Sequence, residues 1–135
     1  MATQVLEIRG SMANIEVDDE LIFPNVLSCL ALVAVCGGQL VGVHMTINDR
    51  GRTSDVAREL TGRFGNPSDL YVVGPISSED YNYSSFANFG GTPHLCNIPG
   101  YIDVRARMVG DRVEFEQCPT GTGAWVAIPA DQFIP

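Results

Sequence analysis

The chain has 135 residues, and because this length can bury a sizeable core, we expect residues 1–135 to form one domain. Its 16 acidic residues outnumber its 8 basic residues, which are all arginine, and the net charge of −8 argues against nucleic acid or an anionic membrane as partner. No apolar stretch reaches the roughly 18 residues of a membrane span, and no signal peptide is visible.

The chain begins with a pattern typical of short strands. Residues 5–8 and 13–17 are expected to be strands around a turn at Gly10. An acidic stretch and a connector over residues 21–24 follow. The acidic stretch, Asp18–Asp19–Glu20, could bind a cation or simply form a solvated turn.

Two apolar runs separated by Gly37–Gly38 predict a β-hairpin. They cover residues 25–36 and 39–47, and a Gly-Gly pair suits the two-residue turns that require positive φ. With this turn, Cys36 pairs with Gln39. The register of the whole hairpin follows from that pair.

The register brings a thiol and an imidazole onto one face. Cys29 lies opposite Thr46 and Ala31 lies opposite His44, so Cys29 and His44 are diagonal neighbours at roughly 5–8 Å between Cβ atoms. A thiol beside a general base is the minimal apparatus of cysteine-dependent acyl transfer. A buried structural cysteine and a buried structural histidine are the alternative interpretation.

One principal helix is predicted, over residues 54–64. Its apolar residues Val56, Leu60 and Phe64 recur every four residues, Thr53 or Ser54 can cap its start, and Gly65 can end it. We expect it to pack on the apolar face of the hairpin. That face presents Leu30, Leu32, Val41, Val43 and Met45.

The second half of the chain predicts a further hairpin. A strand over residues 70–73 precedes a long polar and aromatic loop, residues 76–93. Residues 101–108 and 112–117 then alternate around Gly110–Asp111, and residues 124–128 form a last strand. The expected fold class is therefore α+β, a mainly antiparallel mixed sheet or sheets with one principal helix.

Other motifs predict neither metal nor cofactor. The four cysteines, Cys29, Cys36, Cys96 and Cys118, are expected to be reduced thiols. His94–Leu95–Cys96 has no second ligand pair at a zinc-like spacing, and no phosphate-binding glycine loop occurs. Arg105 and Arg107 could bind an anion, but ion pairs with Glu114 and Glu116 across the second hairpin are the expected role.

The segment from residue 25 to residue 74 resembles a known enzyme group. Val26–Leu27–Ser28–Cys29, a following apolar strand, a turn and Gly42–Val43–His44–Met45 resemble the Cys/His core of CheD-type glutamine deamidases and of deamidase toxins such as cytotoxic necrotizing factor. The helix and the strand that follow keep the order of that core. The cysteine here has no adjacent glycine, which the toxins carry. The resemblance implies a sandwich fold like that of these toxins.

The resemblance also implies a reaction, the deamidation of a glutamine in a target protein. Cys29 would attack the amide, His44 would act as acid and base, and a third group would orient the imidazole. Thr46 is the favoured third group, with Asn48 and Asn97 as further candidates. A main-chain carbonyl can also fill this role in the family, which needs no cofactor.

Two other functions fit the same residues. An acidic binding or inhibitor protein would use the net charge of −8 and keep Cys29 and His44 as core residues. A cysteine-dependent amide or thioester hydrolase would use the same pair. Aromatic residues of the long loop, Tyr81, Tyr83, Phe86 and Phe89, would contact substrate or anchor the loop. A cytoplasmic location is expected, or delivery into a host cell by a non-classical route.

Overall fold

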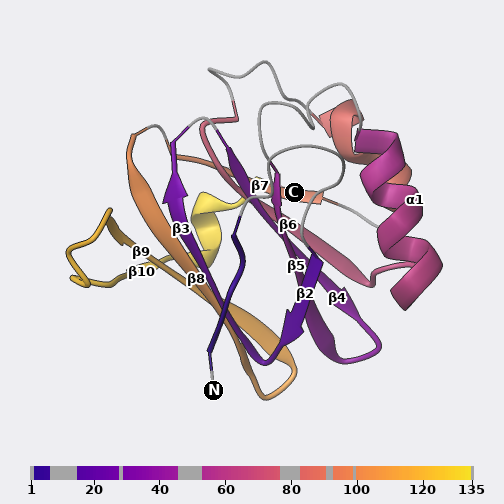
Figure 1. The fold of residues 1–135 in the computed structure, drawn as a ribbon, viewed down its shortest axis with the longest axis horizontal. Coiled ribbons are helices and arrows are strands. Elements are labelled where there is room, and N and C mark those ends of the chain that lie inside the picture. The colour runs from indigo at the N-terminus through magenta and orange to yellow at the C-terminus, as the bar shows by residue number, and fades with distance from the viewer. Residues whose placement is uncertain are drawn as a thin grey trace.

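The computed structural model describes residues 2–6, 15–27, 29–45, 53–76, 83–90, 93–98 and 100–134. Strands within these residues form two five-stranded sheets (Figure 1). Sheet A contains, in spatial order, β1 (Thr3–Gln4), β3 (Glu20–Val26), β8 (Ile102–Val109), β9 (Arg112–Pro119) and β10 (Val126–Ile128). Sheet B contains β2 (Ile15–Asp18), β5 (Gln39–Met45), β4 (Leu30–Cys36), β6 (Asp69–Gly74) and β7 (Pro93–Asn97). The helical segments are α1 (Thr53–Phe64) and two 3₁₀ helices, η2 (Tyr83–Phe89) and η3 (Ala130–Gln132).

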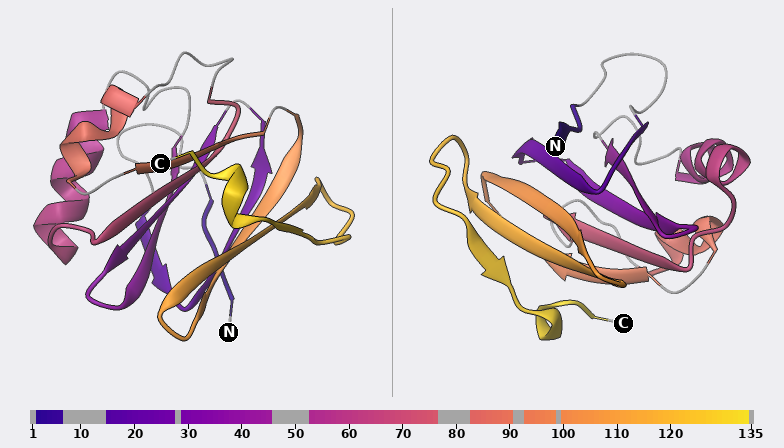
Figure 2. Two further views of the ribbon diagram at one scale, coloured as in Figure 1. Left: turned by 180° about the vertical axis from the view of Figure 1, so that it is seen from behind. Right: turned by 90° about the horizontal axis from the view of Figure 1, so that it is seen from below.

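The two sheets pack face to face, and α1 covers the outer face of sheet B (Figures 1 and 2). Neighbouring strands are antiparallel except for two pairs, β1 with β3 and β6 with β7. The predicted α+β class, with mainly antiparallel sheets and one principal helix, is confirmed. After β10 the chain crosses from sheet A to the edge of sheet B, where Ile134 bridges Leu95.

Strand alternation divides the apolar residues between two cores. Between the sheets lie Val5, Leu21, Phe23, Val26, Ala31, Val33, Leu40, Val73, Cys96, Ile102, Val104, Ala106, Phe115 and Ile128. On the helix side of sheet B, Leu30, Leu32, Val41, Val43 and Met45 pack with Val56, Ala57 and Leu60. The predicted docking of the helix on the hairpin is therefore confirmed. Gly65, at φ +82°, donates its N–H to the Thr61 carbonyl and ends the helix as predicted.

The prediction of a connector over residues 21–24 is wrong, because these residues belong to β3. Proline lacks the N–H that a regular sheet ladder needs, which made Pro24 look like a strand breaker. The register between β3 and β8 shifts between Phe23 and Val26, so Pro24 lies in a bulge. A bulge tolerates the missing donor.

The long loop predicted over residues 76–93 contains regular structure that local pattern does not indicate. η2 lies within it, and β7 begins at Pro93 and runs parallel to β6. Phe86 and Phe89 are fully buried in the helix-side core, so the prediction that they contact substrate is wrong and they anchor this segment instead. Tyr81 and the side chain of Tyr83 lie outside the described residues.

The N-terminal strands also differ from the expected bounds. β1 is Thr3–Gln4, whereas the sequence predicts a strand over residues 5–8. Val5 and Leu6 lie outside a strand, and residues 7–14 lie outside the described part. Val5 is nevertheless buried, in the core between the two sheets.

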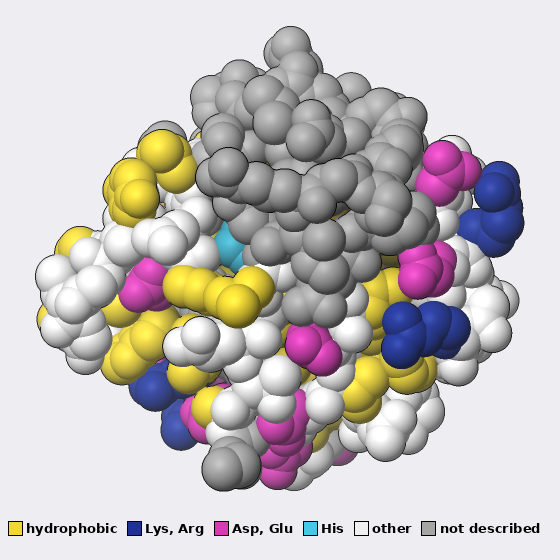
Figure 3. Space-filling model, in the orientation of Figure 1, with side chains coloured by type: hydrophobic (Ala, Val, Ile, Leu, Met, Phe, Trp, Pro, Cys, Tyr) yellow, Lys and Arg dark blue, Asp and Glu magenta, His cyan; other side chains and the backbone are white. Residues whose placement is uncertain are grey.

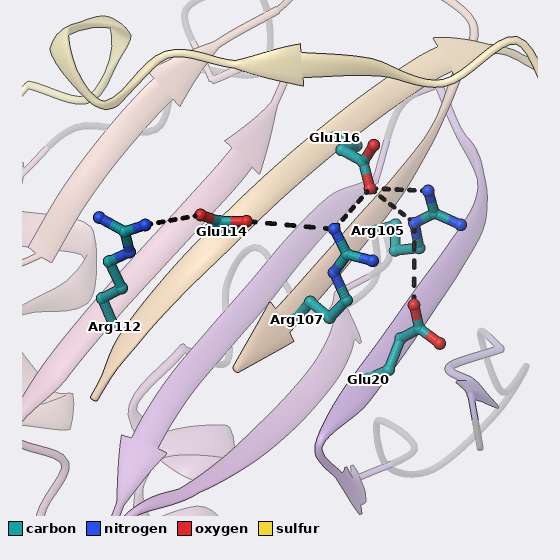
Figure 4. Close-up of polar contacts among 6 residues, drawn as sticks. All are labelled: Glu20, Arg105, Arg107, Arg112, Glu114 and Glu116. Atoms are coloured by element: carbon teal, nitrogen blue, oxygen red, sulfur yellow. Dashed lines mark hydrogen bonds and ion pairs between the residues drawn. The ribbon is translucent and has the colours of Figure 1, made fainter. Parts of the chain in front are cut away.

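The outer face of sheet A carries an array of ion pairs, as predicted. Arg105 lies opposite Glu116 and Arg107 opposite Glu114 in the register of β8 and β9, and Figure 4 shows the contacts. Arg105 Nη2 lies 2.7 Å from Glu116 Oε1, and Arg107 Nη2 lies 3.8 Å from the same oxygen. Glu20 and Arg112 extend the array to both sides.

Basic and acidic side chains are neighbours on the helix as well. On the face shown in Figure 3, the basic side chains over α1 lie beside acidic ones, and Arg58 pairs with Asp55 and Arg63 with Glu59. Such exposed pairs contribute about 0.2–1 kcal/mol each. Among the described residues, no helix is long and apolar enough to cross a membrane.

Candidate active site

The hairpin of β4 and β5 has the predicted turn and register. Gly37 and Gly38 have φ of +58° and +80°, the left-handed values that favour glycine at both turn positions. Cys36 pairs with Gln39, and Ala31 pairs with His44. Cys29 immediately precedes β4. Its predicted partner Thr46 lies outside the described residues.

Alternation along β5 places His44 toward sheet A. Ala31, Val33 and Leu40 belong to the core between the sheets, whereas Leu30 and Met45 belong to the helix-side core. Because side chains alternate along a strand and His44 lies opposite Ala31, the imidazole faces the space between the sheets. Cys29 lies one residue before β4. His44 is 1% exposed and Cys29 is 8% exposed, so both residues are largely shielded from water.

The imidazole of His44 is oriented by a main-chain group. Its Nδ1 lies 2.9 Å from the carbonyl oxygen of Val5. A carbonyl oxygen can only accept a hydrogen bond, so Nδ1 carries the hydrogen, and in the neutral imidazole Nε2 is then the basic nitrogen. This arrangement gives His44 the tautomer that a general base needs, with Nε2 available to take a proton.

The carbonyl of Val5 is held in place by sheet A. The Val5 N–H donates to the carbonyl of Ile22 on β3 at 2.7 Å, which extends the parallel pairing of β1 with β3. Val5 thus bridges the two sheets, with its N–H bound to sheet A and its carbonyl to a side chain of sheet B. The ring of Phe23, 6.2 Å from that of His44 between centroids, packs beside it.

Gly42 allows this close approach of the sheets. It lies on β5 two residues before His44 and faces sheet A. A Cβ at this position would meet three side-chain atoms, Leu21 Cδ1 at 2.7 Å, Phe23 Cζ at 2.9 Å and Val5 Cγ2 at 3.2 Å. A larger residue would have to displace these side-chain ends, one of which belongs to Val5.

A second glycine packs against the backbone of Cys29. Gly74 ends β6 at φ +149°, and a Cβ there would lie 2.9 Å from the Cys29 carbonyl oxygen and 3.3 Å from Val26 Cγ1. Gly74 also accepts hydrogen bonds from the N–H groups of Ile76 and Ile98. The main chain at Cys29 is therefore seated against a fixed segment of β6.

Two of the other cysteines are poor nucleophiles. Burial raises the pKa of the Cys96 thiol to about 11, and burial also raises the pKa of Cys36. A raised pKa keeps a thiol protonated at neutral pH, and the thiolate is the reactive form. All four cysteines are free thiols in the structure, in agreement with the predicted reduced state.

Of the predicted orienting groups, Asn97 lies far from His44. Asn97 lies on β7, and two strands separate it from β5, which at about 4.8 Å per spacing puts roughly 14 Å between the two backbones. Thr46 and Asn48 lie outside the described residues, so their roles stay predictions. The sequence contains no specific signal for Val5, because every residue has a carbonyl.

One cavity among the described residues lies away from this site. A hollow of about 720 Å³ is lined by residues that include Tyr71, His94, Phe115 and Phe133. Tyr71 pairs with Val33, four residues along β4 from Cys29, which corresponds to about 13 Å. His94 stacks on Tyr71 there and lies 3.6 Å from Asp69. The residues that line this hollow include no cysteine.

The acidic side chains Asp18 and Glu20 make contacts within the fold. Asp18 accepts hydrogen bonds from the Thr3 hydroxyl at 2.6 Å and the Asp19 N–H at 2.7 Å, which lower its pKa to about 2. Glu20 lies 3.9 Å from Arg105. No group of three metal-ligating side chains occurs among the described residues.

Comparison with known proteins adds a distant likeness in fold. No family model and no curated protein matches the sequence. Among solved structures, the C-terminal domain of CNFy from Yersinia pseudotuberculosis matches with a TM-score of 0.51 and 9% sequence identity. The match covers 95% of this chain and 60% of that one. At this identity the likeness extends to the fold alone, a sandwich like that of the CNFy domain.

Proposed function

We propose that the chain is a cysteine-dependent protein glutamine deamidase, with Cys29 as nucleophile and His44 as general acid and base. The hydrogen bond between His44 Nδ1 and the Val5 carbonyl carries the proposal, because it orients a buried imidazole on the strand that pairs with β4, the strand that follows Cys29. The sequence resemblance to deamidase toxins and the fold likeness to CNFy support the same reaction.

The proposed first half-reaction forms a thioester. His44 Nε2 takes the thiol proton, and the Cys29 thiolate attacks the side-chain amide carbon of the substrate glutamine. Backbone N–H groups near Cys29 stabilise the oxyanion of the tetrahedral intermediate. The C–N bond then breaks, the protonated imidazole gives its proton to the leaving nitrogen, and ammonia departs.

The second half-reaction restores the thiol. His44 Nε2 takes a proton from water, whose oxygen attacks the thioester carbon. The C–S bond breaks, the proton returns to the Cys29 sulfur, and the product is glutamate. The Val5 carbonyl stabilises the imidazolium that forms twice in this cycle. Water is the only co-reactant.

The partner in this reaction is a target protein. With a net charge of −8, the chain is best matched by a substrate whose surface around the glutamine is basic, because opposite charges speed encounter and suppress wrong partners. Thr46 stays a predicted third member of the site, and Thr46→Val tests it by removing the hydroxyl at nearly constant volume.

The test is ammonia release from protein substrates incubated with the wild-type chain, together with mass spectrometry that maps each Gln-to-Glu change. The Cys29→Ser variant is the control, since serine keeps the shape but is far less ionised than a histidine-paired thiol. Ammonia and a mapped glutamate with the wild type alone support the proposal. Peptide or thioester cleavage that depends on Cys29 without ammonia would indicate a different hydrolase. Tight binding by both proteins without turnover would indicate the acidic binding protein.

A further inference from the structure

The strand that leads to Cys29 contains a bulge opposite one aspartate. In the pairing of β3 with β8, Phe23 lies opposite Val104 and Val26 lies opposite Ile102. Pro24 and Asn25 therefore share a single opposing residue, Asp103. Asn25 has a φ of +59°, which makes it the one non-glycine residue with positive φ among the described residues.

The carboxylate of Asp103 accepts the main-chain N–H that the bulge leaves without a partner in the sheet. Its Oδ1 accepts the Asn25 N–H at 2.9 Å, and its Oδ2 accepts the Gly121 N–H at 3.2 Å. A bulged residue lies outside the regular ladder, so its N–H needs another acceptor. Hydrogen bonds to an ionised carboxylate are about twice as strong as neutral ones. Asp103 thus replaces the missing sheet partner and ties the bulge to the turn at Gly121.

The bulge decides which side chain of β3 packs beside Gly74, where the Cys29 carbonyl also lies. Leu21 and Phe23 face the core, and unbroken alternation would turn Asn25 inward next. Asn25 is instead exposed and Val26 is fully buried. Val26 Cγ1 and the Cys29 carbonyl oxygen then flank Gly74 at 3.3 and 2.9 Å from the position of a Cβ. The bulge therefore sets the direction of the Val26 side chain, and Cys29 follows Val26 by three residues.

We propose that Asp103 is a positioning residue for the Cys29 nucleophile, acting through the Asn25 bulge and Val26. This inference rests on the proposed function, because it assigns Asp103 a role at the same site. Asp103 touches no reacting atom. Its loss should move the Cys29 thiol relative to His44, and a misplacement of about 1 Å can cost up to a hundredfold in rate.

The experiment compares Asp103→Leu, which keeps bulk but has no acceptor, with Asp103→Asn, which keeps one. The matched control is Asp111→Leu, in the turn at the other end of the same hairpin of β8 and β9. Readouts are the rate of Cys29 alkylation by iodoacetamide across pH, kcat and KM for ammonia release, and Tm. Asp103→Leu should slow alkylation and lower kcat on the order of tenfold to a hundredfold, with KM little changed. Asp103→Asn should fall between it and the wild type, and Asp111→Leu should match the wild type.

A wild-type alkylation rate and kcat in Asp103→Leu, with only Tm reduced, would overturn the positioning role. If Asp103→Leu does not fold, Asp103→Ser decides, since one hydroxyl cannot serve both N–H groups and should still slow alkylation. A wild-type rate in folded Asp103→Ser would overturn the inference. Failure of the proposed function is seen separately, as absence of ammonia release from the wild type. Slower Cys29 alkylation in Asp103→Leu would support the positioning role even then.

Discussion

The chain contains two pairs of cysteine and histidine whose histidines differ in hydrogen bonding and solvation. Cys29 immediately precedes β4 and His44 lies on β5, whereas His94 and Cys96 lie two residues apart on β7. His44 is buried, and its Nδ1 is hydrogen-bonded to a main-chain carbonyl. The His94 side chain is 26% exposed, stacks on the Tyr71 ring and lies 3.6 Å from the Asp69 carboxylate. Cys96 is so deeply buried that its pKa rises to about 11. Proximity in sequence is therefore a weaker guide than orientation and solvation.

Activity should separate the two pairs most strongly. Cys29→Ser and His44→Ala should each reduce ammonia release on the order of a thousandfold or more, and the double variant should lose little further, because the two residues act as one unit. Cys96→Ser and His94→Ala should keep turnover. The measurement is kcat/KM on one substrate protein. Loss of activity in Cys96→Ser with retention in Cys29→Ser would move the site to β7.

A truncation in the helix-side core should lower the stability of the whole domain and should not affect one cysteine and histidine pair more than the other. Leu60→Ala in α1 removes a fully buried side chain from the helix-side core and should cost about 2–5 kcal/mol. Chemical denaturation measures the free energy of unfolding. The pH profile of the remaining activity should keep its shape, since the inter-sheet face is unchanged. A cost below about 0.5 kcal/mol would mean that α1 contributes little to that core.

Thiol labelling compares the two cysteines directly. A rise in the pKa of Cys96 from 9.0 to about 11 lowers its thiolate fraction about a hundredfold at neutral pH. Iodoacetamide should therefore label Cys96 at least that much more slowly in the native protein than in urea, whereas Cys29 should be labelled in the native state. Mass spectrometry of timed samples gives both rates. Preferential native labelling of Cys96 would reverse the comparison.

Gly42 offers a substitution beside the residue that orients His44. Gly42→Ala should displace the Leu21, Phe23 and Val5 side chains, cost about 1–3 kcal/mol as overpacking, and reduce kcat by loosening the contact of Val5 with His44. Gly62→Ala is the control, since Gly62 lies in α1 with open space around it and alanine should stabilise the helix by about 0.5–1 kcal/mol. Stability and kcat are measured on both. Unchanged kcat in Gly42→Ala would separate the Val5 contact from catalysis.

A weaker response to pH is expected at β1, the strand that leads to Val5. The Asp18 carboxylate, bound by the Thr3 hydroxyl, has a pKa of about 2 in the folded chain against 3.8 ordinarily. Since the folded pKa is depressed, the stabilisation of β1 is full above about pH 4 and is lost as pH falls through about 2. Hydrogen exchange of the Val5 N–H should quicken over this window, and Thr3→Ala should remove much of the dependence. Equal quickening at β7 would indicate general acid unfolding.

The amino-acid sequence by itself predicts the elements whose signals lie close together along the chain. The Gly37–Gly38 turn and alternation define the register of the hairpin, so the pairing of Ala31 with His44 follows from these residues alone. The spacing of Val56, Leu60 and Phe64 and the following Gly65 define the helix in the same way. The turn glycines and the helix spacing each lie within or next to the element that they predict.

The surroundings of the pair depend instead on the packing of whole sheets. The Val5 carbonyl reaches His44 because Gly42 lets two sheets approach, and a main-chain acceptor from a distant segment has no side-chain signature. The strands β3 and β7 are not predicted, because each also depends on contacts with segments that are distant in sequence. Pro24 is tolerated by a bulge that Asp103 completes from another strand, and β7 is a strand because it pairs in parallel with β6, remote in sequence. Contacts between distant segments form only when the sheets come together, and no local pattern encodes them.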